Sequence, residues 1–250
     1  MSGTAFDRLL AVWLALAATS FAALLVRPAQ YGRYVPPRRR FCVRARWGWL
    51  AMESPAVLAF AAGFVAGRAP RGPVAWSFLA LWMLHYVDRA WAYPFRLGDP
   101  RRPMPLEIVG LAVVFNLANA GLQSAWLFTL SGGYRASWLA DPRFLLGVAL
   151  FGAGLAVNRL ADARLRRWRA GGGYALPGGG LFELVACPNY LGEIVQWLGW
   201  ALATWSLAGL AFAVWTIANL APRARSHLAW YRQRFPEFPA DRRALVPGLW

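Results

Sequence analysis

The sequence predicts an all-α, polytopic membrane protein with seven transmembrane helices, its N-terminus outside and its C-terminus in the cytoplasm. Composition is the first reason: 58% of the 250 residues are hydrophobic and 15% are charged, whereas soluble domains carry about 25% charged residues. Uncharged runs of 18, 27 and 29 residues are the second reason, at Leu9–Val26, Ile108–Tyr134 and Ile194–Pro222. Runs of about 18 or more indicate membrane spans. A soluble enzyme, a disordered chain and a disulfide scaffold are thereby excluded.

The apolar runs divide into seven spans. The first has no clear cleavage site before the Arg-rich stretch that follows, so we interpret it as a span and not as a removable signal. Residues 189–222 are too many for one helix across a core of about 30 Å, and Ser206–Gly209 offers a turn, so this stretch is predicted to be a hairpin. The predicted spans are Phe6–Val26, Trp47–Gly67, Pro73–Phe95, Pro105–Leu130, Phe144–Ala161, Asn189–Thr204 and Leu207–Pro222.

The distribution of arginine predicts the orientation. The net charge is +16, and all 27 basic residues are arginines. With the N-terminus outside, the cytoplasmic connections hold 20 of them and the outer connections 5, as the positive-inside rule requires. Because these arginines flank apolar spans, they indicate a membrane and not a nucleic acid as the partner. The absence of lysine excludes Schiff-base and P-loop lysine chemistry.

Polar residues inside the spans indicate a site. Ionisable groups at membrane depth are costly and are usually functional or paired. Several polar residues recur at i, i+4 and therefore share a helix face. We expect these faces to line one cavity open to the cytoplasm. The residues are Glu53, His85, Tyr86, Asp88, Arg89, the pairs Asn158/Asp162 and Asn189/Glu193, and the triple Arg223/His227/Tyr231.

The connection between the fifth and sixth spans is rich in arginine and glycine. Arg164, Arg166, Arg167 and Arg169 precede two triple-glycine groups, at 171–173 and 178–180. A solvated loop facing anionic lipid would have the same composition. Together with the polar faces, the loop favours a large polar anion such as a dinucleotide. The two cysteines, Cys42 and Cys187, form no CxxC motif, and with two histidines and no HExxH motif we expect no metal.

At these residues the sequence resembles the steroid 5α-reductases, or 3-oxo-5α-steroid 4-dehydrogenases, over nearly the whole chain. The N-terminal Glu and His-Tyr pieces separate it from sterol reductases and membrane methyltransferases, which have similar C-terminal patches. The matching pieces are Tyr31–Arg33, Glu53–Pro55, Leu84–Tyr86 through Arg89, Tyr93–Pro94, Arg102–Pro105, Asp141–Phe144, Asn158 with Asp162, Pro177–Phe182, Asn189–Glu193, Ala201–Leu207, His227 with Tyr231, and Arg243–Pro247.

The resemblance implies a single seven-helix membrane domain over residues 1–250 that uses NADPH to reduce the Δ4 double bond of a 3-oxo steroid. The N-terminal spans would face mainly the substrate, and the C-terminal spans and cytoplasmic loops mainly NADPH. Carried over, the catalytic pair Glu53 and Tyr86 would bind the 3-oxo group. The NADPH site would be lined by Asn158, Asp162, Arg166, Arg169, Tyr174, Asn189, Glu193, Arg223, His227 and Tyr231, and completed by Arg89, Tyr93, Trp49, Tyr31 and Arg102.

Two positions depart from the family pattern. Met52 stands where the family often has Gln before the Glu, so one polar contact near the steroid is missing and the preferred steroid is left open. The loop before Tyr174 is shorter and richer in glycine than in animal members, which puts the phosphate contacts there in doubt. Neither change removes the Glu53–Tyr86 pair.

Other readings remain open. Glu53 and Tyr86 would serve any carbonyl-activated alkene, so the substrate could be another lipid enone, such as a polyprenal or an enoyl thioester. An isoprenylcysteine-type methyltransferase has no obvious use for this pair. A transporter or lipid-binding protein is the alternative of another class, although no inverted repeat is present. We expect a monomer in a bacterial inner membrane, with the endoplasmic reticulum as the other candidate, and no nucleic-acid partner.

Overall fold

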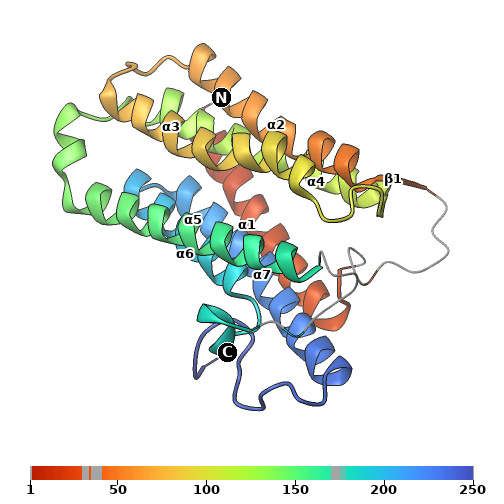
Figure 1. The fold of residues 1–250 in the computed structure, drawn as a ribbon. Helices are drawn as coiled ribbons and strands as arrows, with labels where there is room; N and C mark the ends of the chain where they lie inside the picture. The colour runs from red at the N-terminus through yellow and green to blue at the C-terminus, as the bar shows by residue number, and fades with distance from the viewer. Residues whose placement is uncertain (1, 30–33, 35–40, 170–175, 177, 250) are drawn as a thin grey trace. The chain divides into compact units, whose positions relative to one another are not determined.

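In the computed structural model the described part of the chain forms seven α-helices, labelled in Figure 1. The structure describes residues 2–29, 34, 41–169, 176 and 178–249, and within them the helical prediction is confirmed. The helices are α1 (Gly3–Val26), α2 (Ala45–Ala66), α3 (Pro73–Val87), α4 (Leu106–Ala125), α5 (Pro142–Arg169), α6 (Pro188–Thr204) and α7 (Leu207–Arg234).

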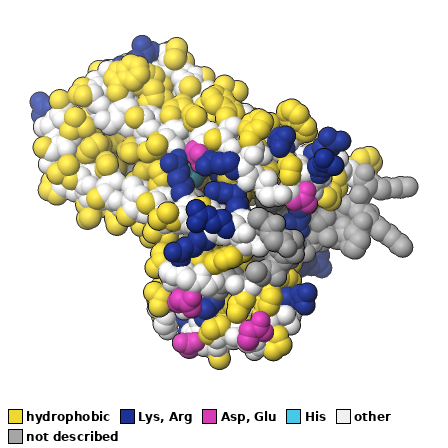
Figure 2. Space-filling model, in the orientation of Figure 1, with side chains coloured by type: hydrophobic (Ala, Val, Ile, Leu, Met, Phe, Trp, Pro, Cys, Tyr) yellow, Lys and Arg dark blue, Asp and Glu magenta, His cyan; other side chains and the backbone are white. Residues whose placement is uncertain are grey.

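Five of these helical segments are long and apolar enough to cross a membrane: α1, α2, α4 with its continuation to Leu130, α5 and α7. The α-helical part of α3 has 15 residues, and α6 has 17. Hydrophobic side chains cover much of the visible surface (Figure 2). Leu58, Leu111 and Leu160, for example, are 59 to 68% exposed, which fits contact with lipid. The chain is thus a polytopic membrane protein, while the count of seven spans and the orientation remain predictions.

Two short strands and two changes of helix type depart from the expected all-α pattern. Strand β1 (Cys42–Arg44) pairs antiparallel with β2 (Pro103–Pro105), with Val43 opposite Met104. The strand forms because each proline biases the residue before it toward extended backbone. The third predicted span continues beyond α3 as a π-helix, Asp88–Ala92, and then as a 3₁₀-helix, Tyr93–Arg96. The fourth ends likewise in a π-helix, Trp126–Leu130.

The chain divides into two compact units, and the first comprises Met1–Leu10 and Gln30–Phe144. Within it, α2 packs against both α3 and α4. Phe60 of α2 stacks on Trp82 of α3 with ring centroids 4.3 Å apart, and Phe64 contacts Trp76 at 4.7 Å. As the contacts move along α2 they move backward along α3, so the two helices run antiparallel. The single-domain expectation remains a prediction.

The second unit comprises Ala11–Ala29 and Leu145–Trp250 and holds α5, α6 and α7. Helices α5 and α6 approach so closely that a Cβ on Gly192 would lie 2.6 Å from the backbone nitrogen of Asn158. The predicted hairpin between α6 and α7 is confirmed, since Ser206 caps α7 by accepting a hydrogen bond from the Gly209 nitrogen at 3.0 Å. Helix α7 does not end near Pro222 as the predicted span does; it continues to Arg234.

Candidate active site

Glu53 lies on α2 with its carboxyl group held by side chains from two other segments. Its side chain is 14% exposed, and Oε1 is 3.9 Å from Nε of Arg89. On the opposite side, Nδ2 of Asn116 on α4 donates to Oε2 at 3.3 Å and to the backbone oxygen of Met52 at 2.6 Å. A carboxyl group in a candidate membrane-spanning helix is therefore held by a cation and an amide, which offset the cost of removing it from water.

The guanidinium group of Arg89, beside Glu53, lies over two aromatic rings. Its guanidinium carbon is 4.4 Å from the centroid of the Trp49 ring and 4.8 Å from that of Tyr93, and these two rings meet edge-on at 5.0 Å. Such cation–π contacts hold an arginine near apolar surroundings. Three residues predicted for the cofactor site, Arg89, Tyr93 and Trp49, thus form one cluster with Glu53 in the first unit.

Tyr86 lies at the level of Glu53 on the neighbouring helix. Trp82, one turn earlier on α3, donates from Nε1 to the backbone oxygen of Ala56 on α2 at 3.0 Å. Because the helices are antiparallel, one turn further along α3 corresponds to one turn back along α2, at Met52 and Glu53. Tyr86 is 4% exposed, and its ring packs on Trp82 at 4.6 Å and on His85 at 4.8 Å.

In the second unit, two polar helix faces meet as the i, i+4 spacing predicts. Nδ2 of Asn158 on α5 donates to the backbone oxygen of Asn189 at 2.9 Å and lies 3.4 Å from Oε2 of Glu193. Nδ2 of Asn189 in turn donates to Oδ1 of Asp162 at 3.1 Å. Two carboxylates and two amides from α5 and α6 therefore form one polar cluster, which we call the α5–α6 cluster.

Two side chains of α7, Arg223 and His227, lie against Tyr190 of α6. The hydroxyl of Tyr190 is 3.2 Å from Nε2 of His227, and the Arg223 guanidinium lies 5.4 Å from the Tyr190 ring centroid. Arg223 also donates from Nη1 to Oδ1 of Asn219 at 3.0 Å. Two of the three predicted α7 residues, Arg223 and His227, thus lie next to Tyr190, which follows Asn189 in the sequence.

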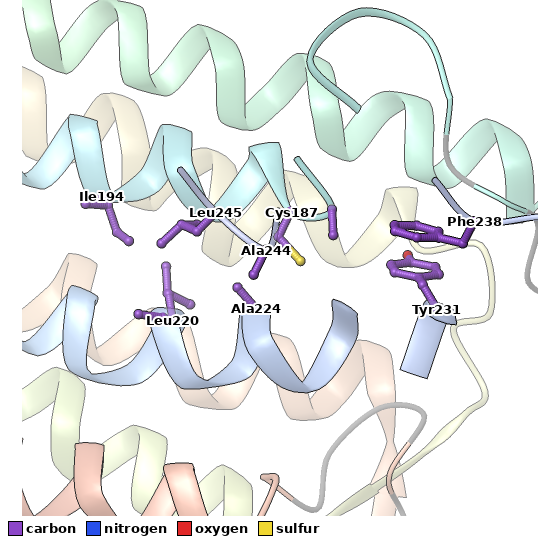
Figure 3. Close-up of a cluster of buried hydrophobic side chains, with 10 residues drawn as sticks. Cys187, Ile194, Leu220, Ala224, Tyr231, Phe238, Ala244 and Leu245 are labelled. Carbon is purple, nitrogen blue, oxygen red and sulfur yellow. The ribbon is translucent and has the colours of Figure 1, made fainter. Parts of the chain in front are cut away.

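Tyr231, the third predicted residue of α7, lies in a hydrophobic cluster (Figure 3). It is 4% exposed, and its ring stacks on Phe238 at 5.6 Å and 5°. Leu245 of the C-terminal segment points between α6 and α7 in the same cluster, near Ile194 and Leu220. The ring of Tyr231 therefore contributes to the core that holds the end of the chain against α6 and α7.

Comparison with known proteins identifies the family. The family model described as 3-oxo-5-alpha-steroid 4-dehydrogenase matches residues 102–250. The chain is 38% identical to 3-oxo-5-alpha-steroid 4-dehydrogenase 1 of Homo sapiens over 99% of this chain and 98% of that protein. It is 43% identical to steroid 5-alpha-reductase DET2 of Solanum lycopersicum over 81% of this chain and 80% of that protein. The chain belongs to the 3-oxo-5-alpha-steroid 4-dehydrogenase family.

Family membership confirms the resemblance and the oxidoreductase class predicted from the motifs. Not every predicted site residue of this family member can be placed. Tyr31 and Tyr174 lie outside the described residues, as does the side chain of Arg169. Arg166 is partly buried on α5, and the backbone oxygen of Arg102, just before β2, accepts from the Ala45 nitrogen at 2.8 Å.

Part of the glycine-rich loop of this family member is described. Gly179 and Gly180 have φ of 76° and 58°, a region that favours glycine. The Arg164 guanidinium donates to the backbone oxygen of Gly179, and Glu183 accepts from the Gly179 nitrogen. Arg164, which lies on α5, therefore binds the backbone of this loop.

Sequence reasoning missed two residues at the site, Asn116 and Tyr190. Tyr190 belongs to the recognised motif Asn189–Glu193, in which only Asn189 and Glu193 were predicted to line the cofactor site. Asn116 had a signal of its own: Asn116, Asn119 and Gln123 recur at helical spacing within an uncharged run, and all three are at most 5% exposed. Among the described residues no group of three His, Cys, Asp or Glu side chains is placed to hold a metal.

The residues of the second unit suit NADPH, the cofactor implied for this family. Carboxylate and amide oxygens of the α5–α6 cluster can accept hydrogen bonds from ribose hydroxyls and a carboxamide, and the amide nitrogens can donate to it. Arg223 and Arg166 supply cations for phosphate oxygens. The donor set of the described residues is therefore compatible with a dinucleotide.

Proposed function

We propose that this membrane enzyme uses NADPH to reduce the Δ4 double bond of 3-oxo-Δ4-steroids to 5α-3-oxo-steroids. The observation that carries the proposal is the Glu53 carboxyl group, which lies between Arg89 and Asn116 in an apolar helix of a chain of this family. The relatives support the reaction by name, since they are 3-oxo-5-alpha-steroid 4-dehydrogenases and steroid 5-alpha-reductases.

In the proposed reaction, Glu53 and Tyr86 donate hydrogen bonds to the 3-oxo group. When bound, NADPH supplies the hydride, which adds to C5 of the steroid. The electrons of the Δ4 bond then move toward the carbonyl, so negative charge develops on the 3-oxygen. Donors aimed at that oxygen stabilise the charge most strongly where water is excluded, and Tyr86 is 4% exposed. A proton delivered to C4 by way of Tyr86 completes the addition of two hydrogens.

Cofactor binding is proposed for the second unit. Asn158, Asp162, Asn189 and Glu193 would hold the nicotinamide and ribose groups, and Arg166, Arg223 and His227 the phosphates. The hydrogen bonds between α5 and α6 support this assignment because they fix the four side chains in one orientation before any ligand arrives. The site would face the cytoplasm of a bacterial cell, where NADPH is available.

The test is a turnover assay on purified protein in detergent or nanodiscs, without oxygen. NADPH deuterated at the transferred position is supplied with a panel of Δ4-3-oxo steroids, and products are read by mass spectrometry. We expect a 5α-reduced steroid that carries one deuterium. Glu53→Ala and Tyr86→Phe, which each remove the proposed hydrogen bond donor, should lower kcat by about 10²- to 10³-fold and leave NADPH binding unchanged. Glu107→Gln, which changes an exposed carboxylate on α4, is the control.

The outcomes separate the alternatives. Steroid product that survives both variants would remove Glu53 and Tyr86 from the chemistry. NADPH binding without any steroid product would redirect the search to a polyprenal or an enoyl thioester. Failure of a folded sample to bind NADPH would overturn the cofactor proposal and favour a transporter or lipid-binding protein. Loss of NADPH binding in Asn158→Leu or Asn189→Leu would support the site in the second unit.

A further inference from the structure

We infer that Asn116 is a positioning residue that orients the Glu53 carboxyl group and determines which of its oxygens carries the proton. The inference deepens the proposed function and rests on it for the role of Glu53. Its basis is the pair of hydrogen bonds from one amide nitrogen, at 2.6 Å to the backbone oxygen of Met52 and at 3.3 Å to Oε2 of Glu53.

The backbone contact fixes the orientation of the amide. A backbone carbonyl oxygen can only accept, so the atom of Asn116 that faces the Met52 oxygen at 2.6 Å is the nitrogen. An amide nitrogen carries two hydrogens and accepts none. Its second hydrogen is therefore available for Oε2 of Glu53, and Oε2 must be the acceptor.

The consequence concerns the proton of a neutral Glu53. A protonated carboxyl group has one hydroxyl oxygen and one carbonyl oxygen. A carbonyl oxygen is the stronger acceptor of the two, so the hydrogen bond from Asn116 to Oε2 favours the hydroxyl on Oε1, the oxygen 3.9 Å from Nε of Arg89. Asn116 thereby restricts Glu53 to one orientation, in which Oε1 is the oxygen that donates to a bound ketone. The side chain of Met52 offers no hydrogen bond donor, so the amide that donates to Glu53 comes from Asn116 on α4.

Burial makes this contact effective. Asn116 is 5% exposed and Met52 is 5% exposed, so little water is present to replace the amide. Asn119 lies one turn further along the same face of α4, is 1% exposed, and within the described part of the chain neither of its amide atoms has a hydrogen bond partner. The two asparagines thus form a matched pair among the described residues, in which Asn116 donates to Glu53 and Asn119 makes no hydrogen bond.

The experiment compares Asn116→Leu and Asn116→Asp with Asn119→Leu in the full-length protein. Leucine is close in shape to asparagine, and aspartate keeps the shape but replaces the donor with an acceptor. We expect both Asn116 variants to lower kcat by about 10- to 100-fold and to shift the pH dependence of kcat, with NADPH affinity and thermal stability measured alongside. Asn119→Leu should leave kcat and its pH dependence unchanged.

A second readout does not depend on turnover. Infrared spectra recorded against pH follow the carbonyl stretch of a protonated carboxyl group, and subtraction of the Glu53→Gln spectrum isolates the Glu53 band. We expect this band and its titration midpoint to shift in both Asn116 variants and not in Asn119→Leu. If wild-type protein reduces no steroid, the proposed reaction fails and the infrared shift alone decides the role of Asn116. An Asn116→Leu variant with wild-type titration and pH dependence would overturn the inference.

Discussion

At the residue scale, the site combines charged and amide side chains that are individually costly to bury. Glu53 is stabilised by Arg89 and Asn116, and Asn158 by its contacts with Asn189 and Glu193. Each contact joins groups from different segments, so a group that loses all of its partners is left unsatisfied in an apolar environment. A buried group left in this way costs about 1 to 3 kcal/mol.

Asn119 offers a direct test of this cost. Because its buried amide has no hydrogen bond partner within the described residues, Asn119→Leu should raise the apparent melting temperature of the protein in detergent, through a gain of about 1 kcal/mol. Asn116→Leu, which removes two hydrogen bonds, should lower it. Light-scattering or fluorescence melting curves measure both. A lower melting temperature for Asn119→Leu would mean that its amide has a partner, such as a buried water molecule.

At the element scale, the α5–α6 cluster depends on the close approach of two antiparallel helices. A Cβ on Gly154 would lie 2.8 Å from Cα of Gln196, and one on Gly192 would lie 2.7 Å from the Gly154 oxygen. These neighbours are backbone atoms, which cannot rotate aside as a side chain can. The approach sets the register that brings Asn158 against Asn189.

Gly154→Ala should therefore separate α5 from α6. We expect a loss of about 1 to 3 kcal/mol from overpacking, seen as a lower melting temperature, together with weaker NADPH binding. Gly152→Ala is the matched control, because a Cβ there meets open space. It should be neutral or stabilise the helix by up to about 1 kcal/mol. Equal behaviour of the two variants would show that the helices do not depend on glycine contact.

The start of α5 carries a pH-dependent cap. Asp141 accepts from the backbone nitrogen of Arg143 at 2.9 Å and pairs with its guanidinium at 2.8 Å. The hydrogen bond from the Arg143 side chain lowers the pKa of Asp141 from the usual 3.8 to about 2. Because this pKa is depressed in the folded protein, the stabilisation is complete above pH 3.8 and is lost as the pH falls toward 2.

Asp141→Asn should accordingly lower the melting temperature near neutral pH by an amount that shrinks between pH 3.8 and 2. Melting curves of wild type and variant over pH 2 to 7 measure the difference. Asp7→Asn, which alters an exposed aspartate on α1, is the control. A difference that stays constant down to pH 2 would contradict a role for the ionised Asp141 carboxylate.

At the scale of the whole molecule, the orientation in the membrane is open to test. Helix α3 and helix α6 are the two whose crossing is least certain from length, at 15 and 17 residues. Single cysteines can be placed on either side of α3 and at both ends of α7, whose first residue, Leu207, also follows the far end of α6. Cys42 and Cys187 are replaced by alanine. Gly72 and Gly98 flank α3 with its helical continuation, and Leu207 and Glu237 flank α7.

With the predicted orientation, Gly72→Cys and Leu207→Cys should react with a membrane-impermeant maleimide in intact cells. Gly98→Cys and Glu237→Cys should react only after the membrane is made permeable. Gel-shift labelling of the full-length protein measures both. Labelling of Gly72→Cys and Gly98→Cys from the same side would mean that α3 does not cross the membrane. The prediction of seven spans would then be wrong.

The sequence by itself determined the family, the helical class and the approximate position of each helix, but not the ends of α5 and α7, which extend beyond the predicted spans to Arg169 and Arg234. These follow from local information: uncharged runs set span length, i, i+4 spacing sets helix faces, and short motifs carry the resemblance. The turn between α6 and α7 was predicted in the same way, because Ser206 caps the helix that follows it. The π-helix after α3 had no such local signal, and the prolines of β2 favour extended backbone without specifying β1 as its partner.

Only the tertiary structure decided which polar residues meet. Asn116 reaches Glu53 across 63 positions of sequence, and Asn158 reaches Asn189 across 31. Such pairs depend on the register between helices, which is set by the packing of small residues and rings such as Gly154 and Trp82. Periodicity fixes the face of one helix but not its position along a neighbour. The sequence therefore predicted Glu53 as a site residue, while the donor that orients it became visible only when α2 and α4 were packed together.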